Sequence, residues 1–501
     1  MRTTPGPRIA AALLLGVLLA QAAWIVAVPP FRGMDEFDHA FRAAGVASGQ
    51  WRLDTPAEGG RGLLVEVPEE LVQASEGQCA DLPYIETSTC DGDGPGERPG
   101  TVLATTSAAN YLPVYYWVVG TAGEPFSGSE SLLAMRVASA ALCALVLALA
   151  GWCLTQWIRG PWALVGLLAG LSPTLLYTTT VVAPNGLEMT AGVLVWAALL
   201  GVARTRAPSA DQLRTERRLL VAAAVGVVLL CGLRALGPLW VALIIVCVAA
   251  LRGPGAVLAT AGRHRLVVAV TVVLAALTTL AVVAWNRGNV DVPKGALNDD
   301  VSDKLVEAFR YPTWVLGSIG AFPYRNQPAP LVVHVLVLLV LGTLLVVAVR
   351  RGRGQGRWAV VIASVLCLAV PTVLVAATLA ERGGIWQGRY SLPFTAGVVL
   401  LAGLVADRAR WRQVPGDVRP QLLATAMLAV AHIVSVVHVQ RAELDRAVSS
   451  SDPGWHDPPV VVTGLVMAAG WVVLAICVAR TSRRLVPREE PAPALAGESG
   501  G

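Results

Sequence analysis

Long apolar runs that alternate with short segments rich in arginine, or in glycine and proline, dominate this chain. A helix needs a run of roughly 20 apolar residues to cross a bilayer. With 55% hydrophobic and only 15% charged residues, the chain is more apolar than a soluble protein of this length. We therefore predict an all-α polytopic membrane protein with about twelve transmembrane helices. The expected spans are Ile9–Val28, Leu132–Leu154, Trp162–Val182, Leu187–Val202, Leu219–Leu233, Pro238–Leu251, Leu266–Trp285, Leu331–Val349, Ala359–Leu379, Pro393–Val405, Leu422–Val439 and Val460–Val478.

Arginine placement predicts the orientation. Alternate loops are rich in arginine, and the positive-inside rule assigns such loops to the cytoplasm. These loops hold Arg2, Arg8, Arg159, Arg204–Arg218, Arg252–Arg265, Arg350–Arg357, Arg408–Arg412 and Arg480–Arg484. The remaining loops, 29–131, 286–329 and 381–392, are then extracytoplasmic and are expected to carry short interfacial helices. The prediction is a multi-pass plasma-membrane protein with both termini in the cytoplasm. The net charge of +5 reflects these loop arginines and does not indicate nucleic-acid binding.

The eight cysteines divide by location. Cys79 and Cys90 lie in the first outer loop, on the oxidising side, at a spacing that a disulfide allows. The other six lie in predicted spans, where cysteine is usually a small buried apolar residue. We expect a disulfide between Cys79 and Cys90.

The first outer loop opens with an acidic segment, Pro29–Gly49. On a helix, Asp35 and His39 share a face at i,i+4, and Glu36 lies close to it. Carboxylates here suit proton removal or cation binding. Acids in the first turn also simply complement the helix dipole, so both interpretations stay open.

Further candidates lie at the outer ends of later segments. Aromatic residues from Tyr111 to Trp117 predict an interfacial helix, serving as an aromatic belt or as a platform for a sugar or headgroup. Arg136 begins the second span, and Arg234 lies where the positive-inside rule disfavours a cation, which suggests an anion ligand. Glu188 lies at the membrane edge. The late loop Glu381–Pro393 offers an amide, a guanidinium and an aromatic ring close together, a set that suits a phosphate beside a sugar. The candidate ligands for such a substrate are Arg389, Gln387, Tyr390, Arg234, Arg325, Tyr111, Tyr115 and Arg136.

Several motifs in this order resemble a bacterial family of predicted membrane proteins, the domain-of-unknown-function family 2142. They are Asp35, Glu36 and His39; the Asn-Tyr-x-Pro-x-Tyr-Tyr segment Asn110–Tyr116; Arg136; the Gly-rich turn Gly317–Tyr324; and Gln387, Gly388, Arg389, Tyr390 and Pro393. The resemblance covers roughly residues 10–440. The family's Asn-Pro-Asp after the third span is here Asn185-Gly186-Leu187-Glu188, with the acid shifted.

That family is similar to GT-C-type glycosyltransferases, which use sugars carried on polyprenyl phosphate. The resemblance implies a GT-C-like transmembrane domain over residues 1–440, followed by a last outer loop and helix at 441–480 and a disordered cytoplasmic tail at 481–501. It implies inverting transfer of a sugar from a lipid-linked donor to a cell-envelope glycan or lipid acceptor on the outer membrane face. Asp35 would be the catalytic base, with Glu36 beside it.

Glu36 and His39 could hold an optional divalent metal ion; no other cofactor is expected. An alternative is a transporter or flippase for lipid-linked sugars or envelope polymer, and a third is an assembly subunit of an envelope complex. A proton-coupled carrier usually shows acids in mid-span, whereas the acids here lie mostly at the outer edge. That placement favours the enzyme.

Overall fold

The structure is a computed structural model of the whole chain. It describes residues 6–57, 62–80, 92, 94–202, 209–287, 306, 310–322, 328–382, 386–414, 417–447, 455 and 458–485. The predicted outer loop 286–329 lies partly outside this part of the chain. The predicted disordered tail 481–501 lies outside it from residue 486 on, and its residues 481–485 are helical.

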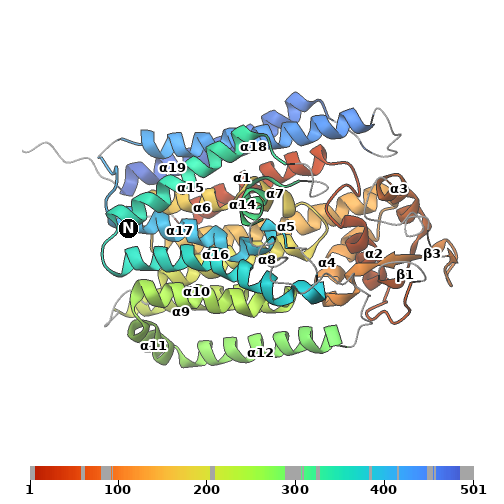
Figure 1. Cartoon of the computed structure of the whole chain (residues 1–501), viewed down its shortest axis with the longest axis horizontal. Coiled ribbons are helices and arrows are strands. Elements are labelled where there is room, and N and C mark those ends of the chain that lie inside the picture. The colour runs from red at the N-terminus through yellow and green to blue at the C-terminus, as the bar shows by residue number, and fades with distance from the viewer. Residues whose placement is uncertain are drawn as a thin grey trace, which may run out of the picture.

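Long helices run roughly parallel along the molecule (Figure 1). Eight helical segments among the described residues are long and apolar enough to cross a membrane, or nine if a bent pair counts as one span. The eight segments correspond to α1 (Gly6–Ala27), α5 (Gly128–Thr155), α12 (Arg265–Arg287), α15 (Leu331–Arg351), α16 (Gln355–Arg382), α17 (Leu392–Arg408), α18 (Arg419–Ala447) and α19 (Val460–Leu485). The prediction of an all-α polytopic membrane protein is therefore confirmed, whereas the number twelve is not.

The remaining predicted spans are helical but shorter, interrupted or partly polar. They are α6 (Trp162–Gly170), α7 (Pro173–Thr178), α8 (Pro184–Gly201), α9 (Ala210–Leu233) and α10 (Gly237–Arg252). A further helix, α11 (Pro254–Arg263), lies in the segment predicted to be an arginine-rich cytoplasmic loop. Ser172 and Pro173 divide one predicted span into α6 and α7, where Ser172 caps α7 by accepting from the Leu175 backbone N–H. The charged first turns of α9 lower its hydropathy. Helices α6, α7 and α8 are nevertheless buried in the bundle, where α17 packs between α6 and α8, whereas α9, α10 and α11 keep exposed residues.

The arginine-rich turns gather at one end of the bundle. There Arg252 donates to the Leu200 carbonyl (2.6 Å), and the carboxylate of Asp407 accepts from the Trp162 backbone N–H (2.9 Å). In Figure 1 this end, on the left, also holds the N-terminus, and the segment after α1 lies at the right end. The alternation of loops that the sequence predicts is therefore present; which end faces the cytoplasm stays a prediction.

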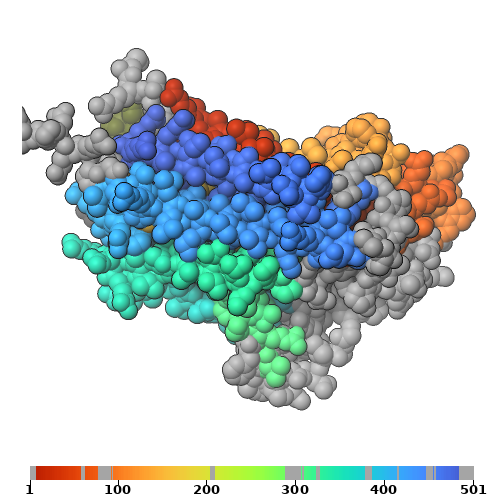
Figure 2. All heavy atoms as spheres, turned by 90° about the horizontal axis from the view of Figure 1, so that it is seen from above, coloured from red at the N-terminus to blue at the C-terminus, as the bar shows by residue number. Residues whose placement is uncertain are grey.

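The first predicted outer loop contains a small folded unit that the sequence left undecided. Its elements are α2 (Glu36–Ala47), β1 (Leu63–Pro68), α3 (Glu69–Ala80), β2 (Gly94–Pro95), β3 (Thr101–Thr106), the 3-10 helix η2 (Ser107–Asn110) and α4 (Pro113–Gly123). The strands form an antiparallel sheet in the order β1-β3-β2, with Leu63 opposite Thr106. Alternate residues of β1 are buried, as a strand with one covered face requires. Figure 2 shows this unit, in orange, beyond the ends of the long helices.

Two further short elements belong to the end of the bundle that carries the candidate active site. These are α14 (Tyr311–Gly320) and the 3-10 helix η3 (Gly388–Ser391), which packs against α14 and leads into α17. The segment from Gly317 to Gly320, predicted as part of a glycine-rich turn, is instead the last turn of α14. The proposed domain boundary at residue 440 falls inside α18, which continues to Ala447.

Candidate active site

The site is centred on the start of α2, where Asp35 occupies the N-cap position. Its backbone is left-handed (φ 57°, ψ 20°), a conformation that costs a non-glycine residue energy and that Asp and Asn tolerate best. The Asp35 side chain does not cap the helix. Its Oδ2 instead lies 3.1 Å from a terminal guanidinium nitrogen of Arg389, which is 354 residues away in the chain. Asp35 therefore forms a long-range ion pair with Arg389 instead of capping the helix.

Arg389 is held in place by the close packing of η3 on α14. A Cβ on the preceding residue, Gly388, would lie 2.5 Å from the Ser318 backbone nitrogen, so only glycine fits this position. The Arg389 side chain is 6% exposed and also contacts the sulfur of Met34. The sequence therefore places glycine before arginine because the loop backbone must approach α14 closely.

Three buried donors beside this ion pair have no hydrogen-bond partner within the described part of the chain. They are Arg389 Nε, Gln387 Nε2 and Trp386 Nε1. Buried polar groups are almost always satisfied in folded proteins, so three unpaired donors on one short loop indicate room for a ligand rich in acceptor oxygens. Gln387 and Arg389 were predicted; Trp386 was not, because no sequence pattern separates it from an ordinary interfacial tryptophan.

A second guanidinium faces the same aromatic ring as the first. The Arg234 guanidinium carbon lies 4.8 Å from the Tyr390 ring centroid and 5.9 Å from that of Tyr111, and the Arg389 guanidinium carbon lies 5.4 Å from the Tyr390 centroid. Arg234 ends α9, where its backbone turns to the extended conformation. The structure thus brings four predicted ligand residues, Arg234, Arg389, Tyr390 and Tyr111, into one cluster.

The segment at the start of α8 supports Arg234. Asn185 Oδ1 accepts a hydrogen bond from Arg234 at 3.2 Å, and Glu188 Oε2 lies 3.7 Å from the same guanidinium. Asn185 was not among the candidates, although its position in a very short turn before Glu188 was a usable signal. Glu188 is buried and faces the cluster, although this acid is shifted along the chain relative to the Asn-Pro-Asp motif of the family that the sequence resembles.

Glu36 and Arg136 form a separate, fully buried ion pair. Both Glu36 oxygens accept from Arg136, at 2.8 and 2.5 Å, and also accept from the backbone N–H groups of Gly33 (3.0 Å) and Val182 (3.2 Å). Arg136 in turn donates to the carbonyl of Val28 (2.7 Å). Neither side chain has capacity left for a substrate or metal, so their geometry is that of a clamp which fixes the α1–α2 connection.

His39 is likewise committed to a protein contact. Its Nδ1 lies 2.7 Å from the Tyr116 hydroxyl, and burial lowers its pKa from 6.5 to about 4. The described residues contain no group of three or more His, Cys, Asp or Glu side chains that could hold a metal ion. The optional metal at Glu36 and His39 is therefore unsupported by the arrangement of these side chains.

Tyr115 does not join the cluster. The Tyr115 hydroxyl pairs with Ser139 Oγ at 2.9 Å inside the bundle. Arg325 and Cys90 lie outside the described residues, as does the side chain of Cys79, so the disulfide stays a prediction.

A largely apolar groove of about 270 Å³ begins beside the cluster. Helices α14, α15, α16 and α17 form most of its walls, and Gly388 and Ser391 of η3, on either side of Arg389 and Tyr390 in the chain, also line it. Tyr311 and Trp314 contribute aromatic surface. The site therefore combines two buried arginines, the carboxylates of Asp35 and Glu188, and an adjoining apolar groove.

Fold and site together define a polytopic α-helical membrane protein with a charged cluster at one membrane end. A family model described as "Predicted membrane protein (DUF2142)" matches residues 18–398. The chain belongs to this family, which confirms the resemblance inferred from its motifs.

Solved structures give weaker likenesses. The crystal structure of ArnT from Cupriavidus metallidurans in the apo state matches with 16% identity and a TM-score of 0.46, over 95% of this chain and 77% of that one. The structure of ArnT bound to undecaprenyl phosphate matches with 16% identity and a TM-score of 0.40, over 90% of this chain and 76% of that one. Both TM-scores are low, so the likeness by itself carries no argument about function. Among curated proteins, none matches this chain.

Proposed function

We propose that this protein is an integral-membrane glycosyltransferase that moves a sugar from a polyprenyl-phosphate carrier to a cell-envelope acceptor on the outer membrane face. The observation that carries the proposal is the ion pair of Asp35 with Arg389 beside a second arginine, Arg234. A carboxylate and two cations at one point suit a reaction that removes a proton and releases a phosphate.

The chemical roles follow from the charges. The acceptor hydroxyl attacks the anomeric carbon and forms the new C–O bond, while the bond from that carbon to the carrier phosphate breaks. Asp35 takes the hydroxyl proton, because a neutral sugar hydroxyl is a poor nucleophile. Arg389 and Arg234 stabilise the negative charge that develops on the leaving phosphate. The products are the glycosylated acceptor and polyprenyl phosphate.

Donor binding would also activate the base. Asp35 contacts Arg389 directly, and a carboxylate paired with a guanidinium is a weak base. A phosphate bound to Arg389 would compete for the guanidinium and displace the carboxylate. The unpaired Arg389 Nε and Gln387 Nε2 offer further donors for phosphate oxygens. Donor binding would then weaken the pairing of Asp35 with Arg389 and make its carboxylate a stronger base, which limits attack by water when no donor is present.

The apolar groove beside η3 would hold the carrier chain. Gly388, the chain neighbour of Arg389, lines it together with residues of α14, α15, α16 and α17. A phosphate on Arg389 would therefore lead its hydrocarbon chain directly into an apolar environment. Glu36 and Arg136 are assigned a positioning role, since their pair fixes the segment that presents Asp35.

The decisive experiment compares the wild type with Asp35→Asn in proteoliposomes supplied with a panel of polyprenyl-phosphate sugars and envelope acceptors. Asparagine tolerates the left-handed backbone, so the variant should fold and still bind donor while release of polyprenyl phosphate falls by about 10²–10⁴-fold. Asp54→Asn, an exposed acid of the same outer unit, is the control. Wild-type turnover by Asp35→Asn would remove Asp35 from the mechanism. Intact donor reaching the opposite leaflet without bond cleavage would instead establish transport.

A further inference from the structure

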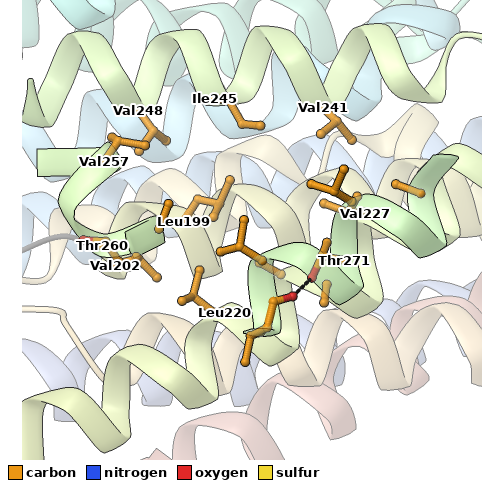
Figure 3. A pocket seen from close by; sticks show the side chains of 17 residues that line it. Leu199, Val202, Leu220, Val227, Val241, Ile245, Val248, Val257, Thr260 and Thr271 are labelled. Carbon is orange, nitrogen blue, oxygen red and sulfur yellow. Dashed lines mark hydrogen bonds between the residues drawn. The ribbon is translucent and has the colours of Figure 1, made fainter. Parts of the chain in front are cut away.

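A second cavity, separate from the proposed active site, lies between α9, α10, α11 and α12, with the end of α8 contributing Leu199 and Val202. Its volume is about 300 Å³, and its lining is almost wholly apolar (Figure 3). The walls include Val227 from α9, Val241 and Ile245 from α10, and Ala275 from α12. No residue of the proposed catalytic cluster takes part.

The few hydroxyl groups in the wall are already satisfied. Thr271 Oγ1 donates to the Val267 carbonyl at 2.7 Å, and Thr260 Oγ1 donates to the Ala256 carbonyl at 3.0 Å, each within its own helix. A trapped water needs two to four polar partners, and apolar cavities of this kind stay dry. Sugars and other polar ligands would lose hydrogen bonds on entry. The chemistry of the wall therefore selects a hydrocarbon.

Helix α12 leaves this cavity accessible from the bilayer. Only 6% of the most apolar stretch of α12 is buried inside the protein, against 89% of the corresponding stretch that contains α17. Figure 1 shows α12 along the lower edge of the bundle, where it packs mainly on α9. A span that touches so little protein is surrounded by lipid, so acyl chains are the hydrocarbon in direct reach.

The end of the cavity next to α11 carries an exposed arginine. Helix α11 turns by 110° relative to α10, so it crosses the end of the cavity, and its Val257 and Thr260 line the wall. The break between α11 and α12 carries Arg263 and Arg265. Arg263 is paired with Glu216 at 3.1 Å, whereas Arg265 is exposed at the first position of the candidate span α12. A cation at that depth meets lipid headgroups.

We propose that this cavity binds one acyl chain of an anionic phospholipid whose headgroup lies against Arg265. The chain fills the space between α12 and the α9–α10 pair and thereby links α12 to the bundle. The inference is independent of the proposed catalytic function, because it rests on residues outside that site.

The test uses two neighbouring alanines of α12. Ala275→Phe fills the cavity, whereas Ala276→Phe adds the same bulk at an exposed position that does not line it. The full chain is reconstituted in nanodiscs of phosphatidylglycerol and phosphatidylethanolamine, released into detergent, and measured by native mass spectrometry. The wild type and Ala276→Phe should retain a phospholipid that Ala275→Phe loses. Equal retention by the two variants would overturn the proposal.

Two further measurements test the headgroup contact and the position of the acyl chain. Arg265→Gln should lower the preference for phosphatidylglycerol about fivefold, the value of one arginine near a membrane surface. An unchanged preference would reject the headgroup assignment. If Ala275→Phe does not fold, wild-type protein is photolabelled with phosphatidylglycerol that carries a diazirine near the end of its acyl chain. Labelling should favour Val241 and Ala275 over Leu277, which is 58% exposed on α12. Labelling that merely follows exposure would contradict the site.

Discussion

The carboxylate of Asp35 and the guanidinium of Arg389 form an ion pair of 3.1 Å, although 354 residues separate them. One member opens the first outer segment and the other precedes α17. Their contact joins two motifs that are distant in the chain into one site. Residues that hold this contact in place should therefore affect both activity and stability.

Replacing Arg389 should impair catalysis more than folding. Arg389→Gln removes a charge aimed at the leaving phosphate, so we expect polyprenyl-phosphate release to fall by about 10²–10³-fold. Arg389→Lys should be intermediate, because a lysine lacks the planar fork of donors. Rates are measured with a lipid-linked sugar donor. Arg98→Gln, which removes an exposed outer arginine, should retain full activity. Equal losses in both variants would contradict a specific role for Arg389.

Breaking the Glu36–Arg136 pair should destabilise the protein. Glu36→Gln leaves a buried guanidinium without its counter-charge, and such losses typically cost about 3–5 kcal/mol of unfolding free energy. Thermal unfolding in detergent should show a large fall in Tm, whereas Glu124→Gln at an exposed position should not. In a double-mutant cycle, Glu36→Gln with Arg136→Met should cost less than the sum of the single changes. Additive effects would show that the two side chains act independently.

Acid should weaken the folded state through His39. Its folded pKa of about 4 lies below the ordinary value of 6.5, so the unfolded chain binds a proton more readily between these pH values. Stability should be flat above pH 6.5 and decline as the pH falls towards 4, by at most about 3 kcal/mol from this group. His39→Asn keeps a polar atom near Tyr116 but does not titrate. Its Tm should therefore depend less on pH between 7.5 and 5 than that of the wild type, and parallel curves would refute the assignment.

Gly192 should be essential for the seating of α17. A Cβ at this position of α8 would lie 2.7 Å from the Cα of Pro393, which is backbone and cannot rotate away. Gly192→Ala should push the start of α17 from α8, lower Tm and reduce activity, since η3 with Arg389 precedes that helix. Gly342→Ala, where a Cβ meets open space, should be neutral or stabilise α15 by about 0.5–1 kcal/mol. A similar Tm for the two variants would contradict the close approach.

The amino-acid pattern alone was enough to predict the membrane class, most helix positions and the identity of the charged motifs. Apolar length, arginine-rich turns and glycine placement are local properties, and a bilayer translates them directly into helices. Local patterns also indicated Gly388, whose missing side chain lets η3 approach α14. The sequence left the small sheet undecided because its short strands lie within a polar, glycine-rich loop.

Only the tertiary structure decided which charges meet. Neighbouring Asp35 and Glu36 look equivalent in the sequence, but the left-handed backbone at Asp35 directs its carboxylate to Arg389, while Glu36 turns inward to Arg136. Arg136 and Arg389 likewise look like similar cations in the sequence. Packing pairs Arg136 with Glu36, whereas Arg389 keeps an unpaired Nε near the apolar groove. These differences arise from contacts between distant helices, which no local pattern encodes.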